Sequence, residues 1–112
     1  MSTLGHGVTF YKRWSLRPGV TVDAVRHFVE QEIVPRYTML SPEVELGLET
    51  DIEGLFVLAI QRWSSVEAHQ QTTTGVRYGE WWSEYEPSLA AWDLLVDFAD
   101  EWTTEPISLQ EG

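Results

Sequence analysis

One histidine in this sequence has the position and chemistry of an acid–base group. His69 follows an apolar strand and Trp63, in the first turns of an expected helix. It lies three residues after Val66 and four before Thr73, so the helix turns it toward the sheet. Imidazole titrates near neutral pH, and in a pocket it could deprotonate a phenol or an enol. Alternatively, His69 packs at the helix start and hydrogen-bonds a backbone carbonyl.

Aromatic residues near His69 could form the walls of a binding site. Trp63 either lines a pocket or plugs the end of the sheet. Tyr78, Trp82 and Tyr85 share one side of a helix, where they form either core or a ligand wall. Trp81 lies about 100° round the helix from Trp82, so one of the two should meet a ligand or a partner subunit.

Arg13 and Arg62 are expected on neighbouring strands. There they would either steady an anionic oxygen of a substrate or pair with surface carboxylates. Tyr37, beside Arg36 near the end of the first helix, is a further candidate for substrate binding.

Histidine spacing and short motifs argue against several other classes of site. No metal is expected, because His6, His27 and His69 come from three separate elements without ligand spacing. The sequence has no GxSxG motif, no phosphate-binding glycine loop and no dinucleotide fingerprint.

The composition narrows the possible partners and compartments. Seven Lys and Arg residues against 18 Asp and Glu residues give a net charge of -11, which repels nucleic acid and anionic lipid. The absence of cysteine excludes disulfide and thiolate chemistry. The longest apolar run, Leu55 to Ile60, is too short to span a membrane. No secretory signal is visible, so we expect a cytoplasmic protein.

Periodicity predicts the elements that position these residues. The first helix should either end near residue 34, because Pro35 discourages its continuation, or extend over Arg36, Tyr37 and Met39 as a kinked turn. Residues 92–102 fit a helix and a strand equally well, and we choose a strand because it completes a split βαβ sheet. The expected order is strand 7–16, helix 21–34, strand 44–48, strand 55–63, a helix from 64 or 65 to about 71, a helical piece carrying Tyr78, Trp82 and Tyr85, and strand 92–102.

This order predicts one α+β, ferredoxin-like domain over residues 1–112, a four-stranded antiparallel sheet with helices on one face. Residues 7–103 form the expected core, and the tail 104–112 is either loose or reaches a partner chain. Alternate residues of the apolar run 55–60 point to opposite faces of the sheet. Leaving three of them exposed would forfeit roughly 1.5 to 3 kcal/mol each, so we expect a homodimer with two sheets packed face to face.

A family resemblance rests on one stretch. The strand 55–62, the segment Trp63-Ser-Ser-Val-Glu-Ala-His69 and the aromatic helix after it resemble the antibiotic biosynthesis monooxygenase domain of the dimeric α/β barrel superfamily, over residues 7–103. That superfamily includes cofactor-free oxygenases, aromatic polyketide cyclases and haem-degrading enzymes. The haem-degrading members use an Asn in the first strand and a later haem-ligating His. This chain has no Asn and no His after His69, which argues against haem.

The resemblance implies a cofactor-free monooxygenase or cyclase acting on an aromatic or polyketide-type, enolisable small molecule. Such an enzyme need only exclude water, orient the substrate and remove one proton. His69 would be the base, and Arg13 or Arg62 would steady negative charge. The walls would be Trp63, Tyr78, Trp82, Tyr85 and Tyr37. The alternative is a non-catalytic homodimer of the same fold that binds a hydrophobic molecule or is purely structural; an interior cavity would favour binding and a filled interior the structural role.

Overall fold

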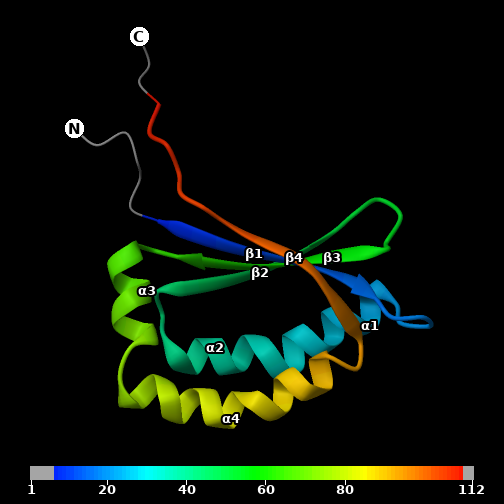
Figure 1. Ribbon diagram of the computed structural model, residues 1–112, viewed down its shortest axis with the longest axis horizontal. Helices are drawn as coiled ribbons and strands as arrows, with labels where there is room; N and C mark the ends of the chain where they lie inside the picture. The colour runs from blue at the N-terminus through cyan, green and yellow to red at the C-terminus, as the bar shows by residue number, and fades with distance from the viewer. Residues whose placement is uncertain (1–6, 110–112) are drawn as a thin grey trace.

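The computed structural model, which describes residues 7–109, has one sheet with its helices on one side (Figure 1). The strands are β1 (Val8–Leu16), β2 (Val44–Thr50), β3 (Phe56–Trp63) and β4 (Val96–Thr104). Neighbouring strands are antiparallel and lie in the order β2-β3-β1-β4. This α+β, ferredoxin-like arrangement confirms the predicted fold class.

The first connection is helical on both sides of a proline. Helix α1 (Val22–Phe28) continues directly into a π-helical turn, η1 (Val29–Ile33), and then into α2 (Val34–Leu40). The helical segment therefore does not end near residue 34, and the alternative, an extension over Arg36, Tyr37 and Met39, is the one that the structure has. The N–H of Val34 donates to the carbonyl of Val29, and this wider turn places Pro35 in the first turn of α2, where no N–H is required.

The second connection contains two helices, α3 (Val66–Thr73) and α4 (Val76–Trp92). Ser65 caps α3 as predicted, since its hydroxyl accepts a hydrogen bond from the N–H of Ala68 at 3.0 Å. The predicted break falls at Gly75, whose φ of 108° is a conformation that favours glycine.

The last strand begins later than predicted. Trp92 ends α4 instead of starting a strand, and β4 begins at Val96. The ring of Trp92 is buried against Trp14 and Phe28, and this packing holds it in the helical layer.

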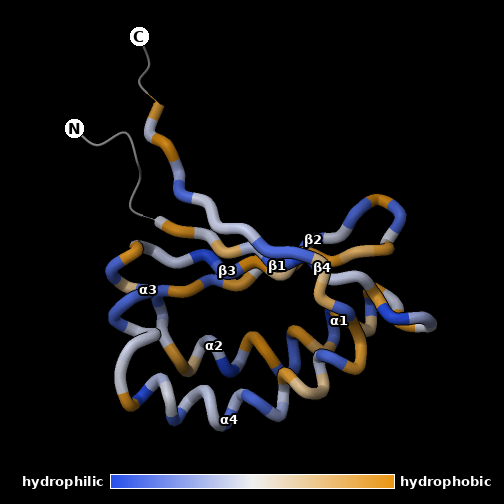
Figure 2. The backbone as a smooth tube through the Cα atoms, viewed as in Figure 1, coloured by the Kyte–Doolittle hydropathy of each residue, from blue (hydrophilic) through white to orange (hydrophobic). Residues whose placement is uncertain are grey.

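The core is divided into two clusters at opposite ends of the sheet. One surrounds Val57 and Trp92, and the other surrounds Val8 and Trp63. Residues of β1 pair with β3 so that Val8 faces Trp63 at one end and Trp14 faces Val57 at the other. Hydrophobic and hydrophilic segments alternate along α2 and α4, as expected for helices covered on one side only (Figure 2).

The other face of the sheet is covered by no helix in the described part of the chain (Figure 1). It carries Phe56, which is 37% exposed, and Trp102, which is 40% exposed and stacks on Tyr11 with ring centroids 5.3 Å apart. Ile60 lies on this face by its register but is only 2% exposed.

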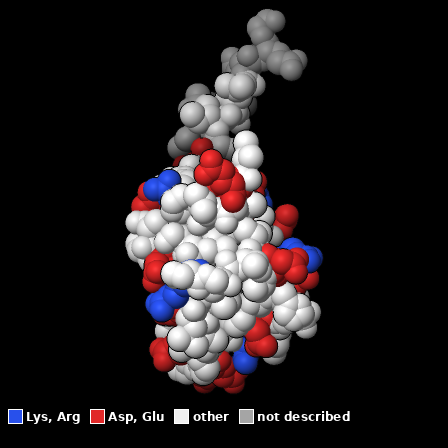
Figure 3. Space-filling view, turned by 90° about the vertical axis from the view of Figure 1, so that its right-hand side faces the viewer, with Lys and Arg blue, Asp and Glu red and all other residues white. Residues whose placement is uncertain are grey.

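On the side of the molecule that Figure 3 shows, acidic side chains are spread around an uncharged area, and more Asp and Glu than Lys and Arg are visible there. None of the helices within residues 7–109 is long and apolar enough to cross a membrane.

Candidate small-molecule site

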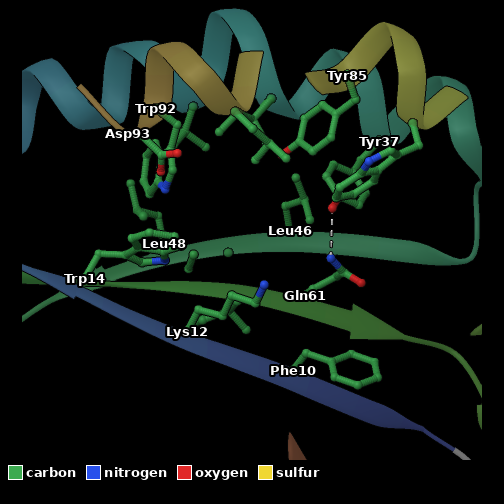
Figure 4. A pocket seen from close by; sticks show the side chains of 17 residues that line it. Phe10, Lys12, Trp14, Tyr37, Leu46, Leu48, Gln61, Tyr85, Trp92 and Asp93 are labelled. Carbon is green, nitrogen blue, oxygen red and sulfur yellow. Dashed lines mark hydrogen bonds between the residues drawn. The ribbon is translucent and has the colours of Figure 1, made fainter. Parts of the chain in front are cut away.

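A cavity of about 320 Å³ lies between the sheet and the helices, in the gap between the two core clusters. A volume of this size is typical of small-molecule sites. The floor comes from β1, β2 and β3, and the roof comes from η1, α2 and α4 (Figure 4). Ala59 occupies the middle of the floor on β3, where a larger side chain would fill the space.

Aromatic side chains supply most of the cavity wall. Such walls suit a flat ring system, because stacked and edge-on rings gain free energy beyond the burial of apolar area. The six aromatic residues of the lining are Phe10, Trp14, Tyr37, Trp82, Tyr85 and Trp92.

A chain of hydrogen bonds ends in the cavity at Tyr37. The indole Nε1–H of Trp63 donates to the Oε1 of Gln61 at 2.5 Å, and the Nε2–H of Gln61 donates to the hydroxyl oxygen of Tyr37 at 3.1 Å (Figure 4). Because an indole can only donate, it fixes which end of the amide faces Tyr37. The Tyr37 oxygen therefore accepts from Gln61, and its own proton remains available to a ligand.

The two tyrosines of the cavity are hydrogen-bond donors, not bases. Burial raises the pKa of Tyr37 to about 12, and hydrogen bonds from Tyr85 and Gln61 oppose only part of that rise. Burial and the neighbouring Tyr37 raise the pKa of Tyr85 well above its ordinary value. Both hydroxyls therefore stay protonated at neutral pH.

Two charged side chains also line the cavity, Lys12 on β1 and Asp93 at the end of α4. The ammonium of Lys12 is 3.8 Å from the carboxylate of Glu101, and both side chains are more than half exposed. A pair of this kind is weak, so Lys12 can turn toward a ligand anion. Of the described residues that line the cavity, Lys12 is the one cation.

The structure brings together three of the residues singled out from the sequence: Tyr37, Trp82 and Tyr85. Trp63 is 3% exposed and does not line the cavity, but it hydrogen-bonds the side chain of Gln61, which does. Tyr78 stacks on Trp81 at 5.6 Å in the second core cluster, outside the cavity lining.

Trp81 and Trp82 face different surroundings, as their spacing predicts. Trp82 lines the cavity, whereas the indole N–H of Trp81 donates to the carbonyl of Arg36 at 2.8 Å. Of the two tryptophans, Trp82 is therefore the one that could contact a ligand in the cavity.

Arg13 and Arg62 do lie on neighbouring strands, but on the face away from the cavity. Arg13 binds the carboxylate of Asp100 at 2.8 Å. The guanidinium of Arg62 lies over Gly47, 2.8 Å from where a β-carbon would be. Neither guanidinium can reach a ligand held between the sheet and the helices.

His69 points toward the sheet as predicted, but the ring of Phe10 separates its imidazole from the cavity. Its imidazole packs 4.6 Å from the ring of Phe10 and 5.1 Å from that of Trp63, centroid to centroid. It is not part of the cavity lining, whereas Phe10 is. Partial burial lowers the pKa of His69, so its neutral form is favoured.

Lys12, Gln61 and Asp93 are polar residues of the lining that were not singled out from the sequence. For two of them, Lys12 and Gln61, strand alternation held a signal. The signal was present, because the alternation of β1 puts Lys12 on the side of Phe10 and Trp14. The alternation of β3 likewise puts Gln61 on the side of Val57.

Comparison with solved structures supports the fold. No family model matches the sequence, and no curated protein matches it. A protein named as an antibiotic biosynthesis monooxygenase from Chloroflexus aurantiacus superposes with a TM-score of 0.60 at 13% identity, covering 94% of this chain and 97% of that chain. SnoaB, a cofactor-independent oxygenase from Streptomyces nogalater, superposes with a TM-score of 0.62 at 11% identity, covering 96% and 97%.

The fold is that of the antibiotic biosynthesis monooxygenases. The same fold occurs in a nipsnap family protein with unknown function from Agrobacterium tumefaciens, with a TM-score of 0.62 at 17% identity over 94% of this chain and 92% of that one. An antibiotic biosynthesis monooxygenase-like fold therefore does not by itself decide the reaction, which has to be argued from the cavity.

A metal ion would need a group of titratable side chains in the described part of the chain. Among residues 7–109, no three His, Asp or Glu side chains are grouped so that they could hold a metal ion. His6 lies outside the described residues.

The lowered pKa of His69 predicts an acid-sensitive contribution to stability. The unfolded chain takes up this proton near the ordinary pKa of 6.5, whereas the folded chain takes it up only at lower pH. The free energy of unfolding of the wild type should therefore fall as the pH falls from about 7 toward about 5. Over that range His69→Gln should lose less free energy of unfolding than the wild type. Urea unfolding at both pH values measures this, with His27→Gln on exposed α1 as the control. Equal losses in wild type and His69→Gln would contradict the assignment.

Proposed function

We propose that the protein binds a flat, enolisable aromatic or polyketide-type molecule in the cavity and promotes its cofactor-free oxygenation or its cyclisation. The observation that carries this proposal is an aromatic-walled cavity in which a buried hydrogen-bond chain presents a single hydroxyl donor, that of Tyr37. A donor fixed in apolar surroundings suits the oxygen of a ketone or a phenol.

The chemistry asks little of the protein beyond holding the substrate anion. Loss of a proton from the enolisable carbon places negative charge on the substrate oxygen. The hydroxyl of Tyr37 and the ammonium of Lys12 would stabilise that charge. In an oxygenation, the anion passes an electron to dioxygen, a CH₂ group becomes a carbonyl, and the second oxygen atom leaves as water. A cyclisation would use the same anion without oxygen.

His69 remains the proposed base. Its neutral form is the form that accepts a proton, and burial favours that form. Rotation of the Phe10 side chain, which separates the imidazole from the cavity, would bring substrate and base into reach.

A second function is favoured by one observation: the described residues of the lining include no histidine, and their one carboxyl side chain, Asp93, is exposed to solvent. The protein would then bind the same class of molecule without converting it. Oxygen uptake and product formation separate the two functions, since both predict binding.

We further propose that the protein works as a homodimer, with the uncovered sheet faces packed on each other. Phe56, Leu58, Tyr11 and Trp102 would be buried there. Each apolar side chain of this size contributes roughly 1.5 to 3 kcal/mol when buried. Under two-fold symmetry, the same apolar patch on each copy is buried against the patch of the other copy.

Anthrone, a tricyclic enolisable ketone, tests the binding site. We expect it to bind and to quench the fluorescence of the tryptophans in the lining. Tyr37→Phe should weaken binding by roughly fivefold, because one net hydrogen bond is worth about 1 kcal/mol. Tyr78→Phe, outside the lining, is the matched control. The site assignment is wrong if Tyr37→Phe binds anthrone as tightly as the wild type; binding with no oxygen uptake would leave the non-catalytic function.

Sedimentation tests the dimer. At micromolar concentration the wild type should sediment as a dimer, and Leu58→Glu should sediment as a monomer because it buries an unpaired charge in each sheet face. Ile52→Glu changes a fully exposed loop residue and should stay dimeric. A wild type that sediments as a monodisperse monomer would count against the interface.

A further inference from the structure

A second cavity of about 330 Å³ adjoins the first. It lies between the edge strand β2 and the helical segment formed by α1, η1 and the start of α2. Both cavities are lined by Val29, Leu46, Gly47 and Leu48, so the two are contiguous. The shared lining includes Val29 of the π-helical turn η1, and turns of this kind are frequent at functional sites.

The two cavities differ in the chemistry of their walls. The first is lined by six aromatic side chains, whereas none of the described residues that line the second is aromatic. Its apolar wall is aliphatic: Val22, Val29, Val34, Leu46, Leu48 and Val57. Branched aliphatic walls accept a flexible hydrocarbon chain as readily as a ring, and without the stacking that would favour the ring.

The charged groups at the second cavity do not offer a site for a charged ligand. The guanidinium of Arg26 is bound by Asp23 at 2.5 Å and by Glu30 at 3.3 Å. Glu49, also in the lining, would repel a carboxylate. An uncharged occupant therefore fits this cavity better than an anionic one.

We propose that the second cavity is the subsite for an unbranched, uncharged alkyl chain carried by the ring system that occupies the first. The inference rests on the proposed function and names its substrate class: an enolisable aromatic ring bearing a hydrocarbon chain. The ring would contact Tyr37 and Lys12, and the chain would pass Val29 and Leu48 toward β2.

A homologous series of 5-alkylresorcinols tests this proposal. Resorcinol and its methyl, propyl, pentyl and heptyl derivatives present the same phenolic ring with a growing chain. The affinity of the wild type, measured by calorimetry, should rise about two- to fourfold per methylene, the upper figure corresponding to about 0.8 kcal/mol. The rise should stop once the chain fills the cavity.

Filling the second cavity should abolish the dependence on chain length. Val34→Trp changes a residue that lines only this cavity, and Val22→Trp provides a second route if the first variant unfolds. Both should keep the wild-type affinity for resorcinol while the affinities of the longer homologues fall to the same value. Val76→Trp, on a residue that is 79% exposed at the start of α4, should behave as the wild type.

The outcomes separate this inference from the function on which it rests. If resorcinol competes with anthrone but the alkyl chain adds no affinity, the subsite is overturned and the proposed function stands. Equal chain-length slopes in Val34→Trp, Val22→Trp and Val76→Trp would also overturn the subsite. If neither anthrone nor any resorcinol binds, the proposed function fails and the subsite fails with it.

Discussion

The cavity depends on the distribution of side-chain size along the sheet. Large aromatic side chains pack between the sheet and the helices at both ends of the sheet. Trp14 packs against Trp92 at one end, and Trp63 fills the other. The middle of β3 carries only Ala59 on the helical side. The cavity of about 320 Å³ between the two clusters has the size of a small-molecule site, and the proposed function rests on it.

The same division explains why the polar groups lie where they do. Gln61 follows Ala59 on the same face of β3, and a buried amide there would be costly without partners. Trp63 and Tyr37 provide a partner for each end of the amide, and the hydroxyl proton of Tyr37 takes no part in these two bonds. The cavity thus combines aromatic walls with an oriented hydroxyl donor, and the proposed function rests on this arrangement.

Strand alternation made much of this predictable from the sequence. It identified β1, β2 and the two-sided apolar strand β3, while helical spacing gave the direction of His69. The expected end of the first helix near residue 34 failed because a π-turn, invisible in the hydrophobic period, makes room for Pro35. The strand predicted from Trp92 failed because that ring fits a helical stripe and an alternating strand equally well, and only packing against Phe28 decides between them.

The candidate site was harder to predict than the fold, for a physical reason. Which aromatic rings line a cavity and which fill the core depends on contacts between elements far apart in the chain. Tyr37 and Tyr85 meet across two helices, and Phe10 screens His69 from the opening. A local sequence pattern does not show that one ring will lie between a histidine and a cavity. Lys12 and Gln61, by contrast, were readable from alternation, because their faces follow from the period of a strand.

The most direct test of the account is to fill the middle of the floor with Ala59→Leu and to measure unfolding and anthrone binding on the same preparation. If the space is a real site, the variant should lose at least tenfold in affinity, while its free energy of unfolding stays unchanged or rises by about 0.5 to 2 kcal/mol as the added methyl groups fill the cavity. If the region is already packed, the variant should instead be destabilised by about 1 to 3 kcal/mol, as in an overpacked core. That destabilisation, together with unchanged binding of anthrone, would contradict the account.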